Sequence, residues 1–320
     1  MQIHSRLAAI LAVAAVALFA AAPAQAQATR TWISGVGSDS NPCSRTAPCK
    51  TWAGAIIVTA AGGEVDCLDP GGFGTLTITK AITLDCGGGV GGQVGSILAS
   101  STNGITINAG PNDKVEIRNL SISGEQQTGF PGIAGIRFNT GAQLTVDHVM
   151  IIGFGGIAST GPGIDFEPSV AGSALIAHDI DIRYNLGPGI FAAPVGGVAA
   201  SAVIDGASSI GNSIGLQVKD GATVTVLNSN ISANSGKGVV VLSTTATATA
   251  NLFNTVVASN TVAGVQTSGT NAKVTLSQSG IYNNGVGISA ATGSVVSFTN
   301  NAFGPNAGNA GAATSTVAPQ

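Results

Sequence analysis

Three charged residues occupy corresponding places in two neighbouring segments of the sequence. Gly135 begins "GIRFN" and Gly163 begins "GIDFE". If both segments are strands, side-chain alternation directs Arg137 outward from one strand and Asp165 and Glu167 outward from the other. Carboxylates two residues apart, with ~7 Å between their Cβ atoms, could hold a calcium ion or flank a glycosidic oxygen. The alternative is an exposed Arg137–Asp165 ion pair worth at most ~1 kcal/mol.

Two of the three histidines also lie beside aspartates. His148 occurs in "VDHVM" and His178 in "AHDID", and a histidine next to a carboxylate is an acid–base combination. Alignment of the two segments places His148 level with Asp179 and leaves His178 one residue out of step. A shift of one residue sends a strand side chain to the opposite face. We therefore expect His148 to belong to a polar column and His178 to be a separate, solvent-facing imidazole.

A repeat indicates which elements must position these residues. Short β-branched runs follow Gly135, Gly163, Gly189, Gly215, Gly238, Gly264 and Gly287, at intervals of 28, 26, 26, 23, 26 and 23 residues. A period of this size is typical of a solenoid, and the runs between turn residues are typical of strands. The period exceeds the ~18 residues of a left-handed hexapeptide coil. The sequence therefore predicts an all-β protein, a right-handed parallel β-helix solenoid of about ten coils.

Polar and apolar columns follow from that repeat. Only 8% of the residues are charged, because a charge repeated at every coil would face itself, whereas stacked amides bond to one another. We expect glycines to supply turns with positive φ. The predicted turn ladder is Asn185, Asn212, Asn234, Asn260 and Asn284, and a second polar column is Asp179, Asn228, Asn254 and Gln278. The predicted interior column includes Ile164, Phe166, Ile190, Leu216, Val218, Val239 and Val241.

The chain divides into four predicted parts. Residues 1–26 have a basic start, an apolar stretch and an A-x-A site, and are identified as a cleaved signal peptide of a secreted or periplasmic protein. Residues 27–63 are the expected N-terminal cap, with a helix from Thr51 to Ala61. Residues 64–303 form the β-helix, and the Gly/Ala/Asn-rich residues 304–320 form a flexible C-terminal tail. No later stretch approaches the ~18 apolar residues of a membrane-spanning helix.

Four cysteines in an exported chain indicate two disulfides, for which three connectivities exist. Cys43 and Cys49 bracket the loop "SRTAP". Cys67 in "EVDCL" and Cys86 in "TLDCG" occupy matching places on successive strands, and one coil spacing suits a disulfide. The sequence favours Cys43–Cys49 and Cys67–Cys86. The alternative, a zinc site, lacks the C-x₂-C spacing and a nearby histidine.

The N-terminal region carries a family resemblance. The order "GSDSNP", "APCKT" and "LDPGGFG" within residues 32–74 resembles the start of exported bacterial right-handed β-helix proteins of the pectate-lyase-like superfamily. The resemblance implies an exterior face on which sugar-cleaving members place acidic groups, often with calcium and a basic residue. Polygalacturonase-type signatures and a dense aspartate cluster are missing from this sequence, so no catalytic residue is carried over.

The functional expectation is an exported, non-catalytic β-helix in envelope structure, adhesion or glycan binding, without a cofactor and with a polysaccharide or cell-surface glycan as partner. The alternative is a polysaccharide lyase or glycoside hydrolase that uses Arg137, Asp165 and Glu167, with Asp165 and Glu167 as calcium ligands. A third class is a secreted passenger that assembles through its ends. With a net charge of −3 and no basic stripe, nucleic acid is not an expected partner.

Overall fold

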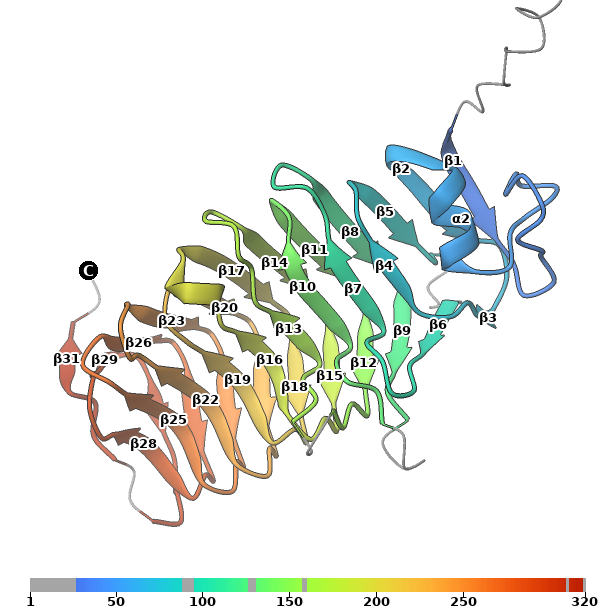
Figure 1. Cartoon of the computed structure of the whole chain (residues 1–320). Helices are drawn as coiled ribbons and strands as arrows, with labels where there is room; N and C mark the ends of the chain where they lie inside the picture. The colour runs from blue at the N-terminus through green and yellow to red at the C-terminus, as the bar shows by residue number, and fades with distance from the viewer. Residues whose placement is uncertain (1–26, 88–94, 126–130, 157–159, 309–310, 319–320) are drawn as a thin grey trace, which may run out of the picture.

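The computed structural model describes residues 27–87, 95–125, 131–156, 160–308 and 311–318. The predicted signal peptide lies outside these ranges. The described chain is a right-handed parallel β-helix whose coils stack along one axis (Figure 1). Within the described residues, no helix has the length and apolar character needed to cross a membrane.

Three parallel sheets form the sides of the solenoid, because each strand pairs with its equivalent one coil away. The 12-stranded sheet contains β1 (Ala28–Ile33), β2 (Thr59–Cys67), β5 (Ile82–Asp85), β8 (Lys114–Arg118), β11 (Gln143–Asp147), β14 (Ala174–His178), β17 (Ala200–Asp205), β20 (Ala222–Leu227), β23 (Ala248–Phe253), β26 (Ala272–Ser277), β29 (Ser294–Phe298) and β31 (Ser315–Val317). The 9-stranded sheet contains β4 (Leu76–Ile78), β7 (Ile105–Asn108), β10 (Ile136–Thr140), β13 (Ile164–Phe166), β16 (Pro188–Ala192), β19 (Ile214–Val218), β22 (Lys237–Leu242), β25 (Ala263–Ser268) and β28 (Val286–Ala290). The 10-stranded sheet contains β3 (Gly71–Gly72), β6 (Gly95–Leu98), β9 (Leu120–Ser123), β12 (Met150–Ile152), β15 (Asp181–Arg183), β18 (Ser208–Ile210), β21 (Asn230–Ser232), β24 (Val256–Ala258), β27 (Gly280–Tyr282) and β30 (Ala302–Phe303).

The coil count differs slightly from the prediction. The smallest sheet has 9 strands among the described residues. The number of coils with a strand in all three sheets is therefore slightly below the predicted number of about ten. In the described part of the chain, the helical elements are α2 (Trp52–Val58) and the 3₁₀ turn η2 (Val195–Gly197).

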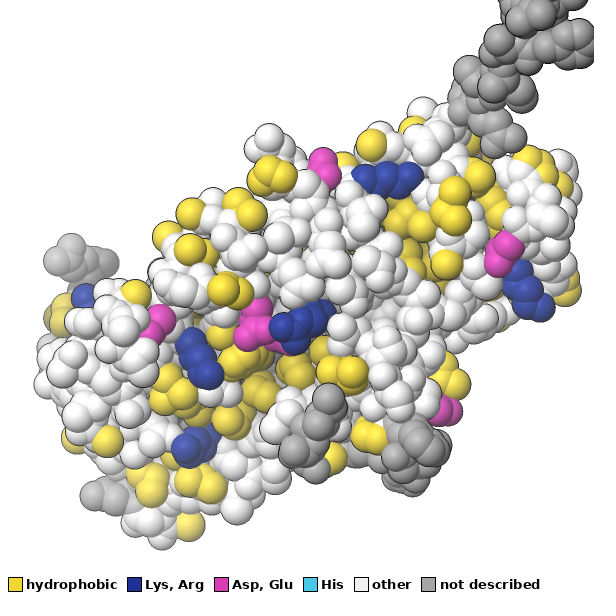
Figure 2. Space-filling model, viewed as in Figure 1, with side chains coloured by type: hydrophobic (Ala, Val, Ile, Leu, Met, Phe, Trp, Pro, Cys, Tyr) yellow, Lys and Arg dark blue, Asp and Glu magenta, His cyan; other side chains and the backbone are white. Residues whose placement is uncertain are grey.

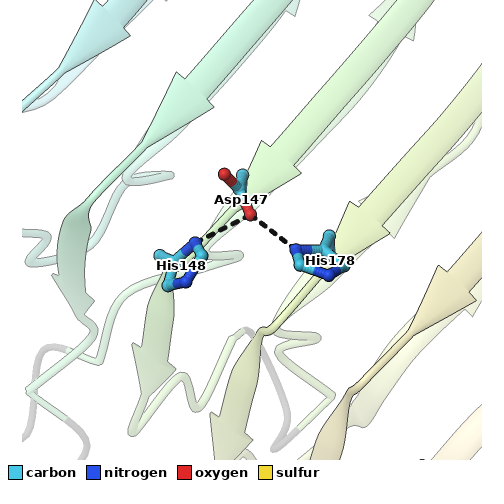
Figure 3. Close-up of side chains that lie close together, drawn as sticks. All are labelled: Asp147, His148 and His178. Atoms are coloured by element: carbon cyan, nitrogen blue, oxygen red, sulfur yellow. Dashed lines mark hydrogen bonds and ion pairs between the residues drawn. The ribbon is translucent and has the colours of Figure 1, made fainter. Parts of the chain in front are cut away.

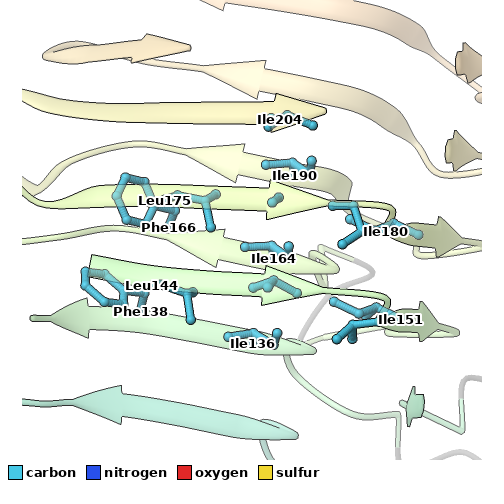
Figure 4. Close-up of a cluster of buried hydrophobic side chains, with 14 of the residues drawn as sticks. Ile136, Phe138, Leu144, Ile151, Ile164, Phe166, Leu175, Ile180, Ile190 and Ile204 are labelled. Atoms are coloured by element: carbon cyan, nitrogen blue, oxygen red, sulfur yellow. The ribbon is translucent and has the colours of Figure 1, made fainter. Parts of the chain in front are cut away.

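The core is a set of stacked aliphatic and aromatic columns (Figure 4). Ile136, Ile164 and Ile190 follow one another in register on β10, β13 and β16. Beside them, the ring centroids of Phe138 and Phe166 lie 5.2 Å apart. All seven residues predicted to point inward are buried, because strand alternation and the coil repeat place like side chains over like.

The glycines before the apolar runs have a role that differs from the expected one. Gly163 and Gly215 do not have positive φ. A Cβ added to Gly163 would lie 2.5 Å from Ile182 Cγ2, and one added to Gly215 would lie 2.2 Å from Ile231 Cγ2. These glycines are therefore required by close packing inside the coil, where the 9- and 10-stranded sheets approach each other.

The N-terminal cap has a shorter helix than the sequence predicted. Helix α2 begins after the N-cap Thr51 and ends at Val58, not Ala61. Thr59 starts β2, and its hydroxyl bonds to Ala55 O at 2.7 Å and to the Thr31 hydroxyl at 2.8 Å. The predicted cap boundary after residue 63 therefore falls inside β2.

The C-terminal segment is more ordered than expected. Residues 304–320 were predicted as a flexible tail, but Ser315–Val317 forms β31 and pairs with β29. Asn306 Oδ1 also accepts hydrogen bonds from the backbone and side chain of Asn284. The described part of this segment therefore continues the solenoid by part of a coil.

The predicted asparagines form a hydrogen-bonded column in the structure. All five are buried. Asn234 Nδ2 donates to Asn260 Oδ1 at 2.8 Å, and Asn260 Nδ2 donates to Asn284 Oδ1 at 2.9 Å. Each of these oxygens also accepts from the backbone N–H of the preceding asparagine. The ladder therefore satisfies backbone groups that the turn leaves without a strand partner.

Two disulfides brace the first coils. Cys43 is bonded to Cys49 and Cys67 to Cys86, with Cα–Cα distances of 4.6 and 4.7 Å. Both pairs are those that the sequence favoured. The second disulfide links β2 to the end of β5, one coil further along the 12-stranded sheet.

Candidate functional site

The exterior of the 9-stranded sheet carries one row of large polar and aromatic side chains. Strand register places Arg137 of β10 beside Asp165 of β13, Asp165 beside Phe191 of β16, and Phe191 beside Gln217 of β19. Because the strands are parallel and in register, these residues follow one another at about the 4.8 Å strand spacing. A second row, two residues further along each strand, contains Glu167 and Lys219.

A groove of about 560 Å³ runs over these rows. Its polar lining includes Arg137, Asp165, Glu167 and Lys219, and its apolar lining includes Phe191. Figure 2 shows acidic and basic side chains gathered beside hydrophobic ones midway along this face. The combination of an apolar floor and a few convergent polar groups is typical of a ligand-binding surface.

Arg137 connects the charged residues of the groove. Its guanidinium lies 2.7 Å from Asp165 Oδ2 and 2.7 Å from Glu167 Oε2. The Nε group also donates to Asn139 Oδ1 at 3.0 Å. The structure therefore brings the three residues predicted from the sequence together, and it ties both carboxylates to one cation.

Asp165 is buried, whereas the ion pair considered from the sequence was an exposed one. Its relative exposure is 4%, because Arg137 and Phe191 flank it one strand spacing away on either side. The Asp165 Oδ1 atom is buried without a hydrogen-bond partner. Burial, followed by repulsion from Glu167, raises the pKa of Asp165 to about 7, against the opposing effect of Arg137.

Arg137 occupies the space between the two carboxylates, Asp165 and Glu167, that were predicted as calcium ligands. One oxygen of each carboxylate already bonds to the Arg137 guanidinium. The guanidinium therefore lies where a bridging cation would bind. Calcium ligation by both carboxylates requires Arg137 to move, and it stays a prediction.

Lys219 and Phe191 form the other half of the groove. The Lys219 Nζ atom lies 4.9 Å from the centroid of the Phe191 ring, a cation–π distance. Both side chains are partly exposed. The groove thus presents an aromatic surface with a cation beside it. This feature could not be predicted from the sequence, because it requires the register between β16 and β19.

A second polar cluster lies at the turn between the 12- and 10-stranded sheets (Figure 3). Asp147 Oδ1 lies 2.8 Å from His148 Nδ1 and 2.9 Å from His178 Nδ1. Burial by itself raises the pKa of Asp147, but the hydrogen bonds from His178 and His148 hold that pKa below its usual range. The same hydrogen bond to Asp147 raises the pKa of His178.

The expectation that the two histidines lie apart is wrong. Asp147 and His178 are register partners on β11 and β14, whereas His148 follows the end of β11 with φ of 51°. Strand alternation does not apply to a residue in this left-handed conformation, and its ring returns toward Asp147. The sequence signal for this turn is the recurrence of asparagine at the same place in other coils, since asparagine tolerates positive φ. The residues of this column with positive φ are Asn119, His148, Asp179, Asn228, Asn254 and Gln278.

Comparisons with known proteins give a partial family match and similar solved structures. A family model described as "Periplasmic copper-binding protein (NosD)" matches residues 189–318, which is less than half of the chain. The search of curated proteins returns no match. Among solved structures, pectate lyase Pel9A superposes with a TM-score of 0.62 and 13% identity, covering 89% of this chain and 79% of that chain. The fold is the pectate-lyase-like β-helix.

A second solved structure supports the same assignment. The A-module of the mannuronan C-5 epimerase AlgE4 from Azotobacter vinelandii superposes with a TM-score of 0.52 and 14% identity, covering 81% of this chain and 91% of that chain. At such identities, the likeness establishes the fold alone.

Proposed function

We propose that this protein is an exported β-helix that binds an extended acidic polysaccharide in the groove over β10, β13, β16 and β19 without cleaving it. The observation that carries the proposal is the pairing of Phe191 with Lys219, both partly exposed, inside a groove of about 560 Å³. An aromatic ring offers a packing surface for the apolar face of a sugar, and a neighbouring ammonium offers a partner for its carboxylate.

The relatives support this class of ligand. The solved structures with the same fold are named for pectate and for mannuronan, which are acidic polysaccharides. The name of the matched family model includes the word periplasmic, which agrees with the export expected from residues 1–26. We therefore place the protein in the periplasm or outside the cell.

The state of the carboxylates favours binding over catalysis. A general acid or base must approach the transferred proton to within about 2.6–3.2 Å. Asp165 presents one oxygen to Arg137, and its other oxygen is buried. Glu167 is bonded to the same guanidinium. In this arrangement the two groups fix Arg137 in the groove wall.

The binding test uses purified mature protein and calorimetry with polygalacturonate, alginate and a neutral glucan. We expect binding to an acidic polymer, weakened at least tenfold by Phe191→Ala and by Lys219→Gln. The matched controls are Phe253→Ala and Lys273→Gln, which change partly or fully exposed residues of the 12-stranded sheet. Equal binding by the groove variants and the wild type would refute the proposal.

A specific observation favours a second candidate, a polysaccharide lyase or glycoside hydrolase. A pKa of about 7 for Asp165 suits a group that exchanges protons near neutral pH. Reducing-sugar and unsaturated-product assays, with and without calcium, separate the two functions. Turnover that Asp165→Asn or Glu167→Gln abolishes would establish the enzyme and overturn the non-catalytic proposal.

A further inference from the structure

We propose that Asp147, His148 and His178 bind one transition-metal ion of the Cu²⁺ or Zn²⁺ class. This cluster is separate from the groove, because its residues belong to the 12-stranded sheet and the turn that follows β11, whereas the groove lies on the 9-stranded sheet. It also lies outside residues 189–318, which the copper-binding family model matches.

In Figure 3 both imidazole rings direct a nitrogen toward the same oxygen of Asp147. Asp147 Oδ1 lies 2.8 and 2.9 Å from the two Nδ1 atoms, and the three ligand atoms all lie within 4.8 Å of one another. A zinc or copper ion about 2.0–2.2 Å from each ligand requires ligand separations near 3.3 Å. To become a coordination site, the two oxygen–nitrogen contacts have to widen by about half an ångström with loss of the Nδ1 protons. The two histidine nitrogens, which lie within 4.8 Å of each other, have to reach the same separation by rotation of their exposed side chains.

A second carboxylate could supply a fourth ligand atom. Asp179 Oδ2 lies 3.5 Å from His148 Nε2 and 3.7 Å from His178 Nδ1. The His148 and His178 side chains are 56% and 51% exposed, so an ion has direct access and water can complete its coordination. The carboxylates of Asp147 and Asp179 supply the negative charge that balances a dication.

The chemistry of the donors selects the class of ion. Imidazole nitrogen suits copper, zinc and nickel, whereas calcium and magnesium prefer sites made of oxygen ligands. Among divalent ions of the first row, the affinity of such sites rises to Cu²⁺. We therefore expect Cu²⁺ and Zn²⁺ to bind and Ca²⁺ not to compete.

The backbone holds the ligands in place before an ion binds. Asp147 and His178 are held by the ladder between β11 and β14. Arg118 precedes Asp147 in this row and Asp205 follows His178, each by one coil. Arg118 lies within 4.0 Å of carboxylates of Glu64, Asp85 and Glu116, so its charge is balanced by other residues.

The variants can be chosen so that the fold is preserved. Asn119, Asn228 and Asn254 occupy the same position in other coils with φ between 48° and 56°. His148→Asn therefore substitutes a residue that this turn accepts, and His178→Asn alters an exposed side chain. Asp181→Asn is the matched control, because it removes a nearby carboxylate that bonds to Arg183 and does not belong to the cluster.

The experiment uses tag-free mature protein treated with chelator and titrated calorimetrically with Cu²⁺, Zn²⁺ and Ca²⁺. We expect one Cu²⁺ or Zn²⁺ per chain, at least tenfold weaker binding in His148→Asn and in His178→Asn, and unchanged binding in Asp181→Asn. Pulsed electron paramagnetic resonance of the Cu²⁺ complex should show imidazole nitrogen coupling that the double variant lacks.

Several outcomes would overturn the metal site. These are the absence of stoichiometric binding by both ions, unchanged affinity in either histidine variant, or a copper spectrum without imidazole coupling. A circular-dichroism melting curve confirms that each variant is folded. Polysaccharide binding in His178→Asn should equal that of the wild type, so failure of the metal site and failure of the groove proposal are distinguishable.

Discussion

Asp165 carries its charge at an energetic cost because it is buried beside a second carboxylate. Its pKa is about 7 in the folded protein, against an ordinary value of 3.8. Between these two values the folded state holds a proton that the unfolded state has released. The contribution of this group to the free energy of unfolding is therefore largest below pH about 4 and falls as pH rises to about 7.

We expect Asp165→Asn to remove this pH dependence. A shift of about 3 units corresponds to roughly 4 kcal/mol, so the free energy of unfolding of the wild type should fall relative to the variant between pH 4.5 and 8. Urea denaturation at several pH values measures the difference. Glu116→Gln, which removes a partly exposed carboxylate on β8, should track the wild type. Parallel curves for the wild type and Asp165→Asn would contradict the buried-charge account.

The turn ladder is the feature that joins the elements along one edge of the solenoid. Asn234 Oδ1 accepts from the Asn212 backbone N–H at 2.9 Å, and Asn234 Nδ2 bonds to Ser209 O and Asn260 Oδ1. The asparagine therefore satisfies groups on the coils before and after its own. Loss of one such residue leaves buried polar groups unpaired, and each costs about 1–3 kcal/mol.

Asn234→Ala should lower the free energy of unfolding by about 2–4 kcal/mol, because the Asn212 N–H and the Ser209 carbonyl lose their partners. Urea unfolding followed by circular dichroism measures the change. The control is Asn230→Ala on β21, an exposed position where a change within about 0.5 kcal/mol is expected. Similar losses in both variants would show that the amide ladder contributes little.

At the scale of the whole molecule, each coil contacts its neighbours and the ends need separate protection. Helix α2 covers the first coil (Figure 1). Its Trp52 is fully buried and packs edge-to-face on Phe73 with a centroid distance of 5.9 Å. In a solenoid each coil is stabilised mainly by its immediate neighbours. Loss of the Trp52 packing should therefore destabilise the nearby coils first.

Trp52→Ala should destabilise the N-terminal coils by about 3–5 kcal/mol and leave the distant ones protected. Amide hydrogen exchange is expected to rise in β2 and β5 and to stay unchanged in β22 and β25. The control is Trp32→Ala on β1, where the side chain is only partly buried. A uniform rise along the chain would instead indicate one cooperative unit.

The sequence was informative wherever a residue repeats with the coil. Asn234 and Asn260 recur at the same place before a glycine, so their contact could be predicted without coordinates. His148 and His178 could not be paired in this way, because alternation fails at a residue with positive φ. The end of α2 was also misplaced, because Thr59 closes the helix with a bond to Ala55 O and makes a tertiary bond to the Thr31 hydroxyl of β1.

By itself, the sequence determined the architecture. A period of 23–28 residues with short β-branched runs predicts a solenoid in which equivalent strands stack on one another. It also placed Arg137, Asp165 and Glu167 on one exterior face. Only the tertiary structure decided that Asp165 is buried, that Lys219 lies over Phe191, and that two imidazoles share Asp147. These properties depend on distances between side chains from different coils, which the strand register and the local turn conformation set.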